Sequence, residues 1–213
     1  MKNRKLLLLG CFLTTLFVVW TFLVIRCDVQ RIGPAGSAVG LATLNGWFHN
    51  LTGVSMELYT ITDWLEIVPL ISAGYFACMG LYQLITRRSF FNVDRGLYIL
   101  GVFFLIVIGI FILFEKLAIN YRPVLIDGEL EASYPSSTTL LVSTVMPVSI
   151  MQFKQRFKNS SSFNILIAVF TLFMVIGRTV AGVHWLSDII GSILISTALV
   201  LFYAYACSNN LSK

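Results

Sequence analysis

The sequence predicts an all-α, polytopic membrane protein with six transmembrane helices, and three observations support this. Hydrophobic residues make up 57% of the 213-residue chain and charged residues only 12%, with a mean hydropathy of +0.85. Uncharged apolar stretches recur along the chain, and basic residues gather in alternate connecting segments. This composition is typical of a membrane protein and not of a soluble core. Because no repeat or low-complexity tract divides the chain, we expect residues 1–213 to form a single membrane domain.

Each expected span is an apolar stretch that approaches the roughly 20 residues needed to cross a bilayer. The stretches are 6–25, 67–85, 97–114, 138–153, 163–177 and 189–207. The first three carry no charge, whereas the last three reach a spanning length only if they extend into polar sequence. Pro147 is acceptable inside the fourth, since neighbouring helices can satisfy freed backbone groups. Residues 8–11, Leu-Leu-Gly-Cys, faintly resemble a lipoprotein cleavage site. The apolar run continues past Cys11, which favours an uncleaved first span.

The distribution of basic residues predicts the orientation of these spans in the membrane. With the N-terminus in the cytoplasm, the inner segments hold Lys2, Arg4, Lys5, Arg87, Arg88, Arg95, Lys154, Arg156, Lys158 and Lys213. Nine of the ten acidic residues then fall outside, and only Asp94 falls inside. Both termini are therefore expected in the cytoplasm. The net charge of +5 reflects topology, so no nucleic-acid partner is expected, and the small size and short loops suit a bacterial cell membrane.

The longest connecting segment, residues 26–63, lies on the outer side. It contains Trp47, Phe48 and Tyr59, and Trp64 follows directly, which are aromatic residues typical of the lipid headgroup layer. Two interpretations stay open. The segment forms either an interfacial helix that covers a site or a plain loop along the membrane surface without a gating role.

Three polar clusters at the outer ends of spans, residues 116–123, 134–138 and 178–188, are the candidates for function. Ionisable groups at membrane depth are costly and therefore mark functional sites. His184 and Asp188 are four residues apart, so on a helix they would share a face, and the carboxylate would fix the imidazole tautomer and make the ring a nucleophile. Arg178 can hold phosphate oxygens in its guanidinium fork. The alternative for the pair is a structural hydrogen bond.

The other two clusters supply further anion-binding groups. Pro135 followed by Ser136, Ser137 and Thr138 is a helix start whose free N–H groups favour an anion, although simple capping would explain it equally. Lys116 and Arg122 add two cations, which could instead serve as interface anchors. Pro123 predicts that the helix stops before Arg122. No metal-ligand cluster is visible, since the other histidine, His49, lies in the outer segment, so no metal or other cofactor is expected.

In this order and spacing, the three clusters resemble the motifs of the type-2 phosphatidic acid phosphatases, a family of membrane lipid phosphatases. Arg178, His184 and Asp188 match the third motif with Gly177 in place of Ser, while Arg122-Pro123 and Pro135-Ser136 match parts of the first and second. The resemblance covers about residues 114–191, and we place the phosphatase-like core at about 97–207. It implies a phosphate-binding role for Lys116, Arg122, Ser136 and Arg178, nucleophilic attack by His184 and orientation of that ring by Asp188. The N–H groups near Ser136, Ser137 and Thr138 would add to the phosphate site.

Two departures from the family pattern matter. Only five residues separate Lys116 from Arg122 where the family has six, which on an unbroken helix would place them on different faces. Thr138 stands where the family has the histidine that protonates the leaving group, and threonine cannot act as an acid near neutral pH. His49 is one alternative source of that proton.

The sequence therefore predicts a metal-independent lipid phosphatase that acts through a phosphohistidine, with reduced or absent activity possible because of Thr138. Cleavage of a diphosphate expels a phosphate ester, which needs less protonation than an alkoxide, so a polyprenyl diphosphate is the expected substrate. A lipid phosphotransferase and a non-catalytic lipid-phosphate-binding protein are the alternatives. Membrane lipids are the expected partners, and the oligomeric state is left open.

Overall fold

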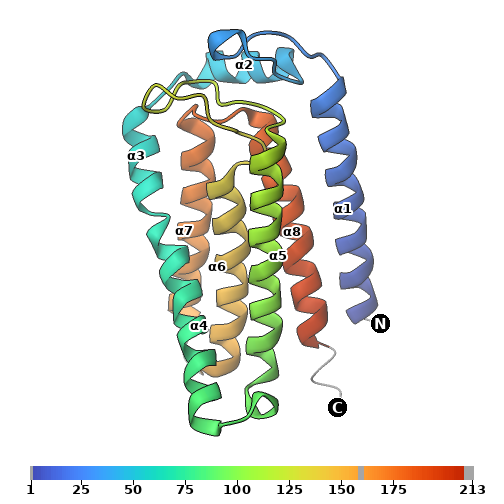
Figure 1. Cartoon of the computed structure of the whole chain (residues 1–213), viewed down its shortest axis with the longest axis vertical. Helices are drawn as coiled ribbons and strands as arrows, with labels where there is room; N and C mark the ends of the chain where they lie inside the picture. The colour runs from blue at the N-terminus through green and yellow to red at the C-terminus, as the bar shows by residue number, and fades with distance from the viewer. Residues whose placement is uncertain (1, 158–160, 209–213) are drawn as a thin grey trace.

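The computed structural model describes residues 2–157 and 161–208, and within these ranges the chain is built from helices and connecting loops (Figure 1). The α-helices are α1 (Lys2–Arg26), α2 (Ala42–Thr52), α3 (Met56–Trp64), α4 (Ile67–Arg87), α5 (Arg95–Leu117), α6 (Ser137–Arg156), α7 (Ser161–Val180) and α8 (Leu186–Ser208), with 3₁₀ turns η1 (Pro34–Gly36) and η2 (Phe90–Asn92). The all-α prediction is confirmed. Lys158 and Lys213, two of the residues used to orient the chain, lie outside the described residues.

The six long helices run alternately up and down the bundle, so α1 begins and α8 ends at the same end (Figure 1). By length and composition, five segments of the described chain could cross a membrane: Asn3–Arg26, Met56–Arg87, Arg95–Leu117, Ser161–Val180 and Leu186–Ser208. The expected fourth span, 138–153, forms helix α6 but does not reach that apolar standard.

Helix α6 tolerates polar residues because it lies among α4, α5, α7 and α8 (Figure 1) and many of its side chains are buried against protein. Thr138, Thr139, Thr144, Ser149 and Gln152 are all buried along it. Thr144 and Ser149 each donate a hydrogen bond to the carbonyl oxygen four residues earlier, at 2.7 Å, so their hydroxyl groups are satisfied within the helix.

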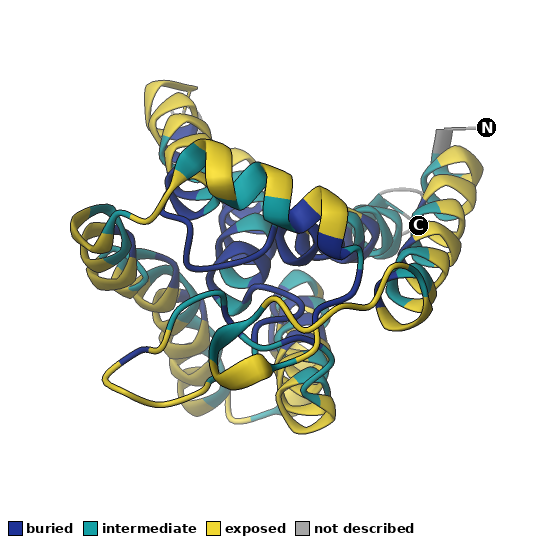
Figure 2. Cartoon of the chain, turned by 90° about the horizontal axis from the view of Figure 1, so that it is seen from above, coloured by how far each residue is buried: buried dark blue, intermediate teal, exposed yellow. Residues whose placement is uncertain are grey.

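Buried residues are concentrated in the middle of the bundle and exposed residues on the outward faces of the helices (Figure 2), where many of the exposed side chains are large and apolar. Leu8, Phe12, Leu105 and Ile165 are each at least 60% exposed. Exposed apolar area on this scale marks an interaction surface, and on a helical bundle of spanning length it fits contact with lipid tails.

Residues 26–63 form helices α2 and α3 rather than a plain loop. In Figure 1, α2 lies across the end of the bundle opposite the start of α1. Its buried Asn45 exchanges two hydrogen bonds with Ser187, the side-chain amide donating to Ser187 Oγ at 2.9 Å and the Ser187 N–H donating back at 3.0 Å. Helix α2 is therefore fixed on the first turn of α8, as the covering-helix interpretation expects.

A hairpin-like loop joins α5 to α6 at the same end. Asp127 and Gly128 both have positive φ, 50° and 82°, and bridge pairing joins Ile126 to Glu129 around them. Two left-handed residues are what a tight hairpin turn requires, and Asp-Gly is a favoured pair for it. Further back, the Ser133 N–H donates to the Asn120 carbonyl at 2.8 Å, which places these two side chains together above α8.

Candidate functional site

The candidate site lies at the end of the bundle that α2 covers, and its nucleophile candidate stands in a turn. Helix α7 ends at Val180 and α8 begins at Leu186, so His184 precedes α8 and does not share a helical face with Asp188 as the spacing predicted. Gly182 makes this turn possible. Its φ is +69°, and a Cβ there would lie 1.9 Å from the Gly53 carbonyl oxygen, so the chain reverses where only glycine fits.

Ser133 connects His184 to Asp188. The His184 Nδ1 and Asp188 Oδ2 atoms are 3.9 Å apart. Ser133 Oγ lies 3.0 Å from Nδ1 and donates a hydrogen bond to Oδ2 at 2.5 Å. With its own proton given to Asp188, the hydroxyl accepts the Nδ1 proton of the ring. This relay fixes the tautomer that leaves a lone pair on Nε2.

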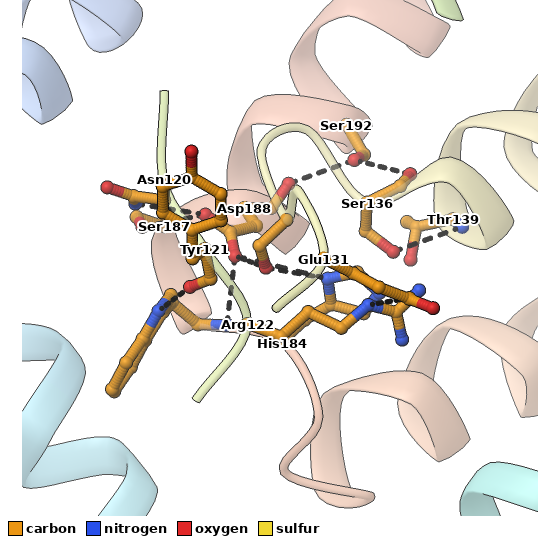
Figure 3. A network of polar contacts seen from close by, with 12 residues as sticks. Asn120, Tyr121, Arg122, Glu131, Ser136, Thr139, His184, Ser187, Asp188 and Ser192 are labelled. Atoms are coloured by element: carbon orange, nitrogen blue, oxygen red, sulfur yellow. Dashed lines mark hydrogen bonds and ion pairs between the residues drawn. The ribbon is translucent and has the colours of Figure 1, made fainter. Parts of the chain in front are cut away.

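The Asp188 carboxylate is completely buried and well supplied with donors (Figure 3). Besides Ser133, it accepts hydrogen bonds from the Trp185 N–H at 3.0 Å, Asn120 Nδ2 at 3.2 Å and Ser187 Oγ at 3.3 Å. Such donors stabilise a buried carboxylate. Asn120 and Ser133 were missed by the sequence analysis, although the Asp-Gly pair between them is a recognisable hairpin signal.

The His184 ring is buried, and this holds its pKa well below the ordinary value. Burial is the main cause, because it disfavours the charged ring, and the positive charges of Arg122 and Arg178 lower the pKa further. The imidazole is therefore neutral at physiological pH. Its Nε2 atom is buried without a hydrogen-bond partner among the described residues, so the lone pair is available for chemistry.

Arg178 stands in the last turn of α7 with only 1% of its side chain exposed. One terminal nitrogen contacts Asp63 Oδ1 and Glu66 Oε1, each at 3.3 Å. The other donates to the Tyr59 carbonyl and to Thr62 Oγ1, each at 3.2 Å. All four partners come from α3 and its junction with α4, so this junction holds the guanidinium in place.

Arg122 approaches the same region from the hairpin-like loop. Its Nε lies 3.0 Å from Glu131 Oε2 on the opposite arm of the hairpin. The Tyr59 ring connects the two arginines, since its centroid is 5.7 Å from Arg122 Cζ and 4.7 Å from Arg178 Cζ. Figure 3 shows Arg122, His184 and Asp188 gathered together.

The second cluster begins helix α6, as predicted. Ser136 is the N-cap and accepts a hydrogen bond from the Thr139 N–H at 3.4 Å, while Ser137 opens the helix. The backbone of Ser136 is tied to α8, because its carbonyl accepts a hydrogen bond from Ser192 Oγ at 3.0 Å. Thr138 is buried and its hydroxyl donates to Glu66 Oε1.

Lys116 and His49 lie at the margin of the site. Helix α5 ends at Leu117, which confirms that the helix stops before Arg122, but Lys116 is exposed on its last turn and no described contact joins it to the cluster. His49, the alternative proton source, lies near the site: its ring centroid is 5.4 Å from that of Trp185, the neighbour of His184. Among the described residues, no group of three or more His, Cys, Asp or Glu side chains could hold a metal ion.

The site brings together a neutral imidazole with an unpaired nitrogen, two guanidinium groups and a helix N-terminus. Groups of these kinds have the chemistry to hold a phosphoryl anion beside a nucleophile. Glu66, Asp63 and Tyr59 also belong to this region, and no local sequence pattern distinguished them from ordinary interfacial residues.

The comparisons with known proteins concern the family and the fold. Residues 116–212 match the model of the PAP2 superfamily. The fold is similar to the crystal structure of the first transmembrane PAP2-type phosphatidylglycerolphosphate phosphatase from Bacillus subtilis, with a TM-score of 0.61 and 17% identity over 96% of this chain and 97% of that one. No curated protein matches the sequence. The match of residues 116–212 to the PAP2 superfamily model confirms the resemblance drawn from the three polar clusters.

Proposed function

We propose that this chain is a membrane-embedded lipid phosphatase that hydrolyses a lipid phosphate or diphosphate through a phosphohistidine on His184. The observation that carries the proposal is the neutral His184 ring, linked through Ser133 to Asp188, with Nε2 unpaired near two arginines. A site that only binds anions has no need of an oriented imidazole nucleophile.

The reaction takes two steps. In the first, the Nε2 lone pair attacks phosphorus and the bond from phosphorus to the leaving oxygen breaks. The ring becomes positively charged as the N–P bond forms, and the Ser133–Asp188 relay stabilises that charge. In the second step, water attacks the phosphohistidine, the N–P bond breaks, its electron pair returns to Nε2, and inorganic phosphate leaves.

Phosphate binding would use Arg122, Arg178 and the N–H groups at the start of α6, near Ser136, Ser137 and Thr138. Both guanidinium groups are paired with carboxylates: Arg122 with Glu131, and Arg178 with Asp63 and Glu66. Substrate binding is then an exchange, in which phosphate oxygens replace carboxylate oxygens. We keep a phosphate-binding role for Lys116 as a prediction, which requires its exposed side chain to reach inward on binding.

An apolar groove next to the site supports a lipid substrate. It lies between α4, α5 and α6 and has a volume of about 300 Å³. Its lining residues are Glu66, Leu70, Val107, Ile108, Phe111, Ser137, Leu140 and Leu141. The polar members, Glu66 and Ser137, stand at the helix ends nearest the arginines, while the apolar members lie along the helices. A lipid chain in this groove would present its phosphate to the site.

The residue at position 138 favours a diphosphate as substrate. Thr138 cannot protonate a departing alkoxide, and the loss of general acid help typically costs about 10²–10⁴-fold in rate. A diphosphate expels a phosphate ester, which leaves with less assistance. We therefore propose a polyprenyl diphosphate as the preferred substrate over a lipid monophosphate.

We further propose that the chain is one membrane domain with six spans, the core spanning about residues 97–207. The polar helix α6 would be the sixth span, shielded from lipid by its neighbours. Arg4, Lys5, Arg87 and Arg88 lie at the end of the bundle opposite the site, which supports cytoplasmic termini and an extracytoplasmic site. A bacterial cell membrane remains our proposed location.

The test is phosphate release by the purified protein in detergent, with a polyprenyl diphosphate and a lipid monophosphate, each with and without a chelator. We expect release that is faster with the diphosphate, insensitive to the chelator and lost in His184→Ala. Labelled phosphate should be trapped on the protein as an acid-labile, base-stable adduct. Transfer of label to an added alcohol without free phosphate would favour a phosphotransferase, and binding without release would favour a non-catalytic protein.

A further inference from the structure

We propose that Glu66 is the catalytic acid of this site, donating the proton to the leaving oxygen that the family's histidine would donate from position 138. This inference rests on the proposed phosphatase function. Three observations support it: the contact of Glu66 with Thr138, its contact with the phosphate-binding Arg178, and its place at the polar end of the apolar groove.

Glu66 places a carboxyl group beside Thr138, the position at which the family has a histidine. It is the N-cap residue of α4, two positions after the end of α3, and its Oε1 atom accepts hydrogen bonds from Thr138 Oγ1 and, at 3.3 Å, from Arg178. Threonine is shorter than histidine, so the carboxyl group can approach the backbone of α6 at this position. A proton donor is thereby restored to the place where the motif has lost one.

The groove identifies the oxygen that Glu66 would face. In a lipid phosphate, the leaving oxygen is the atom that joins phosphorus to the lipid. A lipid chain in the groove and a phosphate between Arg122 and Arg178 would place this oxygen where the groove meets the arginines. Among the groove's lining residues, only Glu66 has an ionisable side chain, and it also contacts Arg178.

The proton balance closes over the two steps. In the first, the carboxylic acid of Glu66 gives its proton to the leaving oxygen as that oxygen separates from phosphorus, and becomes a carboxylate. In the second, the carboxylate accepts a proton from the attacking water as the new P–O bond forms. The acid is regenerated when phosphate leaves. Phosphate binding to Arg178 would release Glu66 from its ion pair for this role.

By supplying a proton, Glu66 would reduce the preference for diphosphates that the loss of histidine at position 138 creates. An alkoxide needs the proton most, so Glu66 would support the monoester reaction that Thr138 cannot. The diphosphate reaction would depend on it less. The preference for diphosphates should therefore widen when the carboxyl group is removed.

Glu66→Gln tests the inference, with Asp63→Asn as a matched control. Both substitutions keep side-chain size and remove one carboxylate 3.3 Å from the same Arg178 nitrogen, but Asp63 neither lines the groove nor contacts Thr138 in any described interaction. In Glu66→Gln we expect kcat for the lipid monophosphate to fall about 10²–10⁴-fold and kcat for the diphosphate to fall less than about tenfold. Asp63→Asn should change kcat for both substrates by the same factor.

Equal losses on both substrates in Glu66→Gln would show that Glu66 only positions Arg178, and no loss would exclude it from the chemistry. A second variant, Thr138→His in the Glu66→Gln background, should restore monoester cleavage by returning an imidazole. A monoester-selective loss in His49→Gln, with none in Glu66→Gln, would assign the proton to His49 and overturn the inference. If the unmodified protein releases phosphate from neither substrate, the proposed function itself fails, which is a separate outcome.

Discussion

His184 and Asp188 act on each other through a third side chain. Their Nδ1 and Oδ2 atoms are 3.9 Å apart, and the hydroxyl of Ser133 contacts both. Ser133 comes from the loop before α6, so the orientation of the proposed nucleophile, His184, depends on how that loop packs against α8. The relay also explains how a ring in the α7–α8 turn is held although it lies outside the helix that carries its carboxylate.

Removal of this hydroxyl should reduce activity without unfolding the protein. In Ser133→Ala we expect kcat/KM to fall about 10- to 100-fold, because a hydrogen bond to a charged group is worth about 1.5–3 kcal/mol. Ser187→Ala is the matched control, since its hydroxyl contacts the other Asp188 oxygen, at 3.3 Å, and not the ring. Phosphate-release kinetics compare the two, and equal losses would argue against a specific relay through Ser133.

The lowered pKa of His184 predicts a pH profile. Since burial and the two arginines keep the folded-state pKa well below 6.5, kcat/KM should hold as pH falls through 6.5 and decline only at lower pH. The same shift has a stability consequence. The contribution of neutral His184 to the free energy of unfolding is fully present above pH 6.5. It is lost as pH falls through the lowered folded-state pKa, because the unfolded chain binds the proton more readily.

Arg122→Gln removes one of the positive charges that depress this pKa, so the acid limb of the remaining activity should move toward higher pH. A pH series of kcat/KM on both proteins gives the measurement. An acid limb above pH 6.5 in the unmodified protein would contradict a neutral, buried nucleophile.

The Arg122–Glu131 pair should compete with substrate. Their side chains are 9% and 42% exposed, and a partly solvated pair of this kind is worth at most about 1 kcal/mol. Glu131→Gln frees the guanidinium, so the inhibition constant for inorganic phosphate should fall by up to about fivefold. Competitive inhibition assays measure it. A weaker affinity for phosphate in the variant would mean that Glu131 holds Arg122 in its binding position.

Gly191 allows the Tyr134 ring to pack against α8. A Cβ at this position would lie 2.7 Å from the Tyr134 hydroxyl oxygen, and the ring is almost fully buried, so Gly191→Ala should cost about 1–3 kcal/mol of stability. Gly109→Ala on α5 is the control, because a Cβ there meets nothing within 4 Å and alanine favours helix by about 0.5–1 kcal/mol. The midpoint of thermal unfolding in detergent should fall in Gly191→Ala and rise in Gly109→Ala. Equal shifts would show that Tyr134 can move aside.

Local sequence patterns predicted the parts of the site that depend on neighbours along the chain. The Pro135-Ser136 start of α6 and the position of Arg178 at the end of α7 follow from capping rules and apolar periodicity. The spacing of His184 and Asp188 predicted a shared helical face, which is wrong. Helix α7 ends before His184, in a turn that Gly182 permits.

The remaining partners are remote in sequence, which is why the sequence alone did not reveal them. Glu66 meets Arg178 across 112 positions, and Asn120 meets Asp188 across 68. Each contact depends on how separate helices pack, and no residue spacing records that packing. The Asp127-Gly128 pair was the one readable signal, since a hairpin centred there brings Asn120 and Ser133 together.

The polar, largely buried helix α6 has a consequence for biosynthesis. A helix with so many hydroxyl groups partitions unfavourably from the translocon into lipid when it is alone. Two of the helices that pack against it, α7 and α8, are strongly apolar. We therefore expect α6 to remain at the translocon until these later helices emerge and to insert into the bilayer together with them. A nascent chain truncated after residue 157 would then leave α6 outside the membrane.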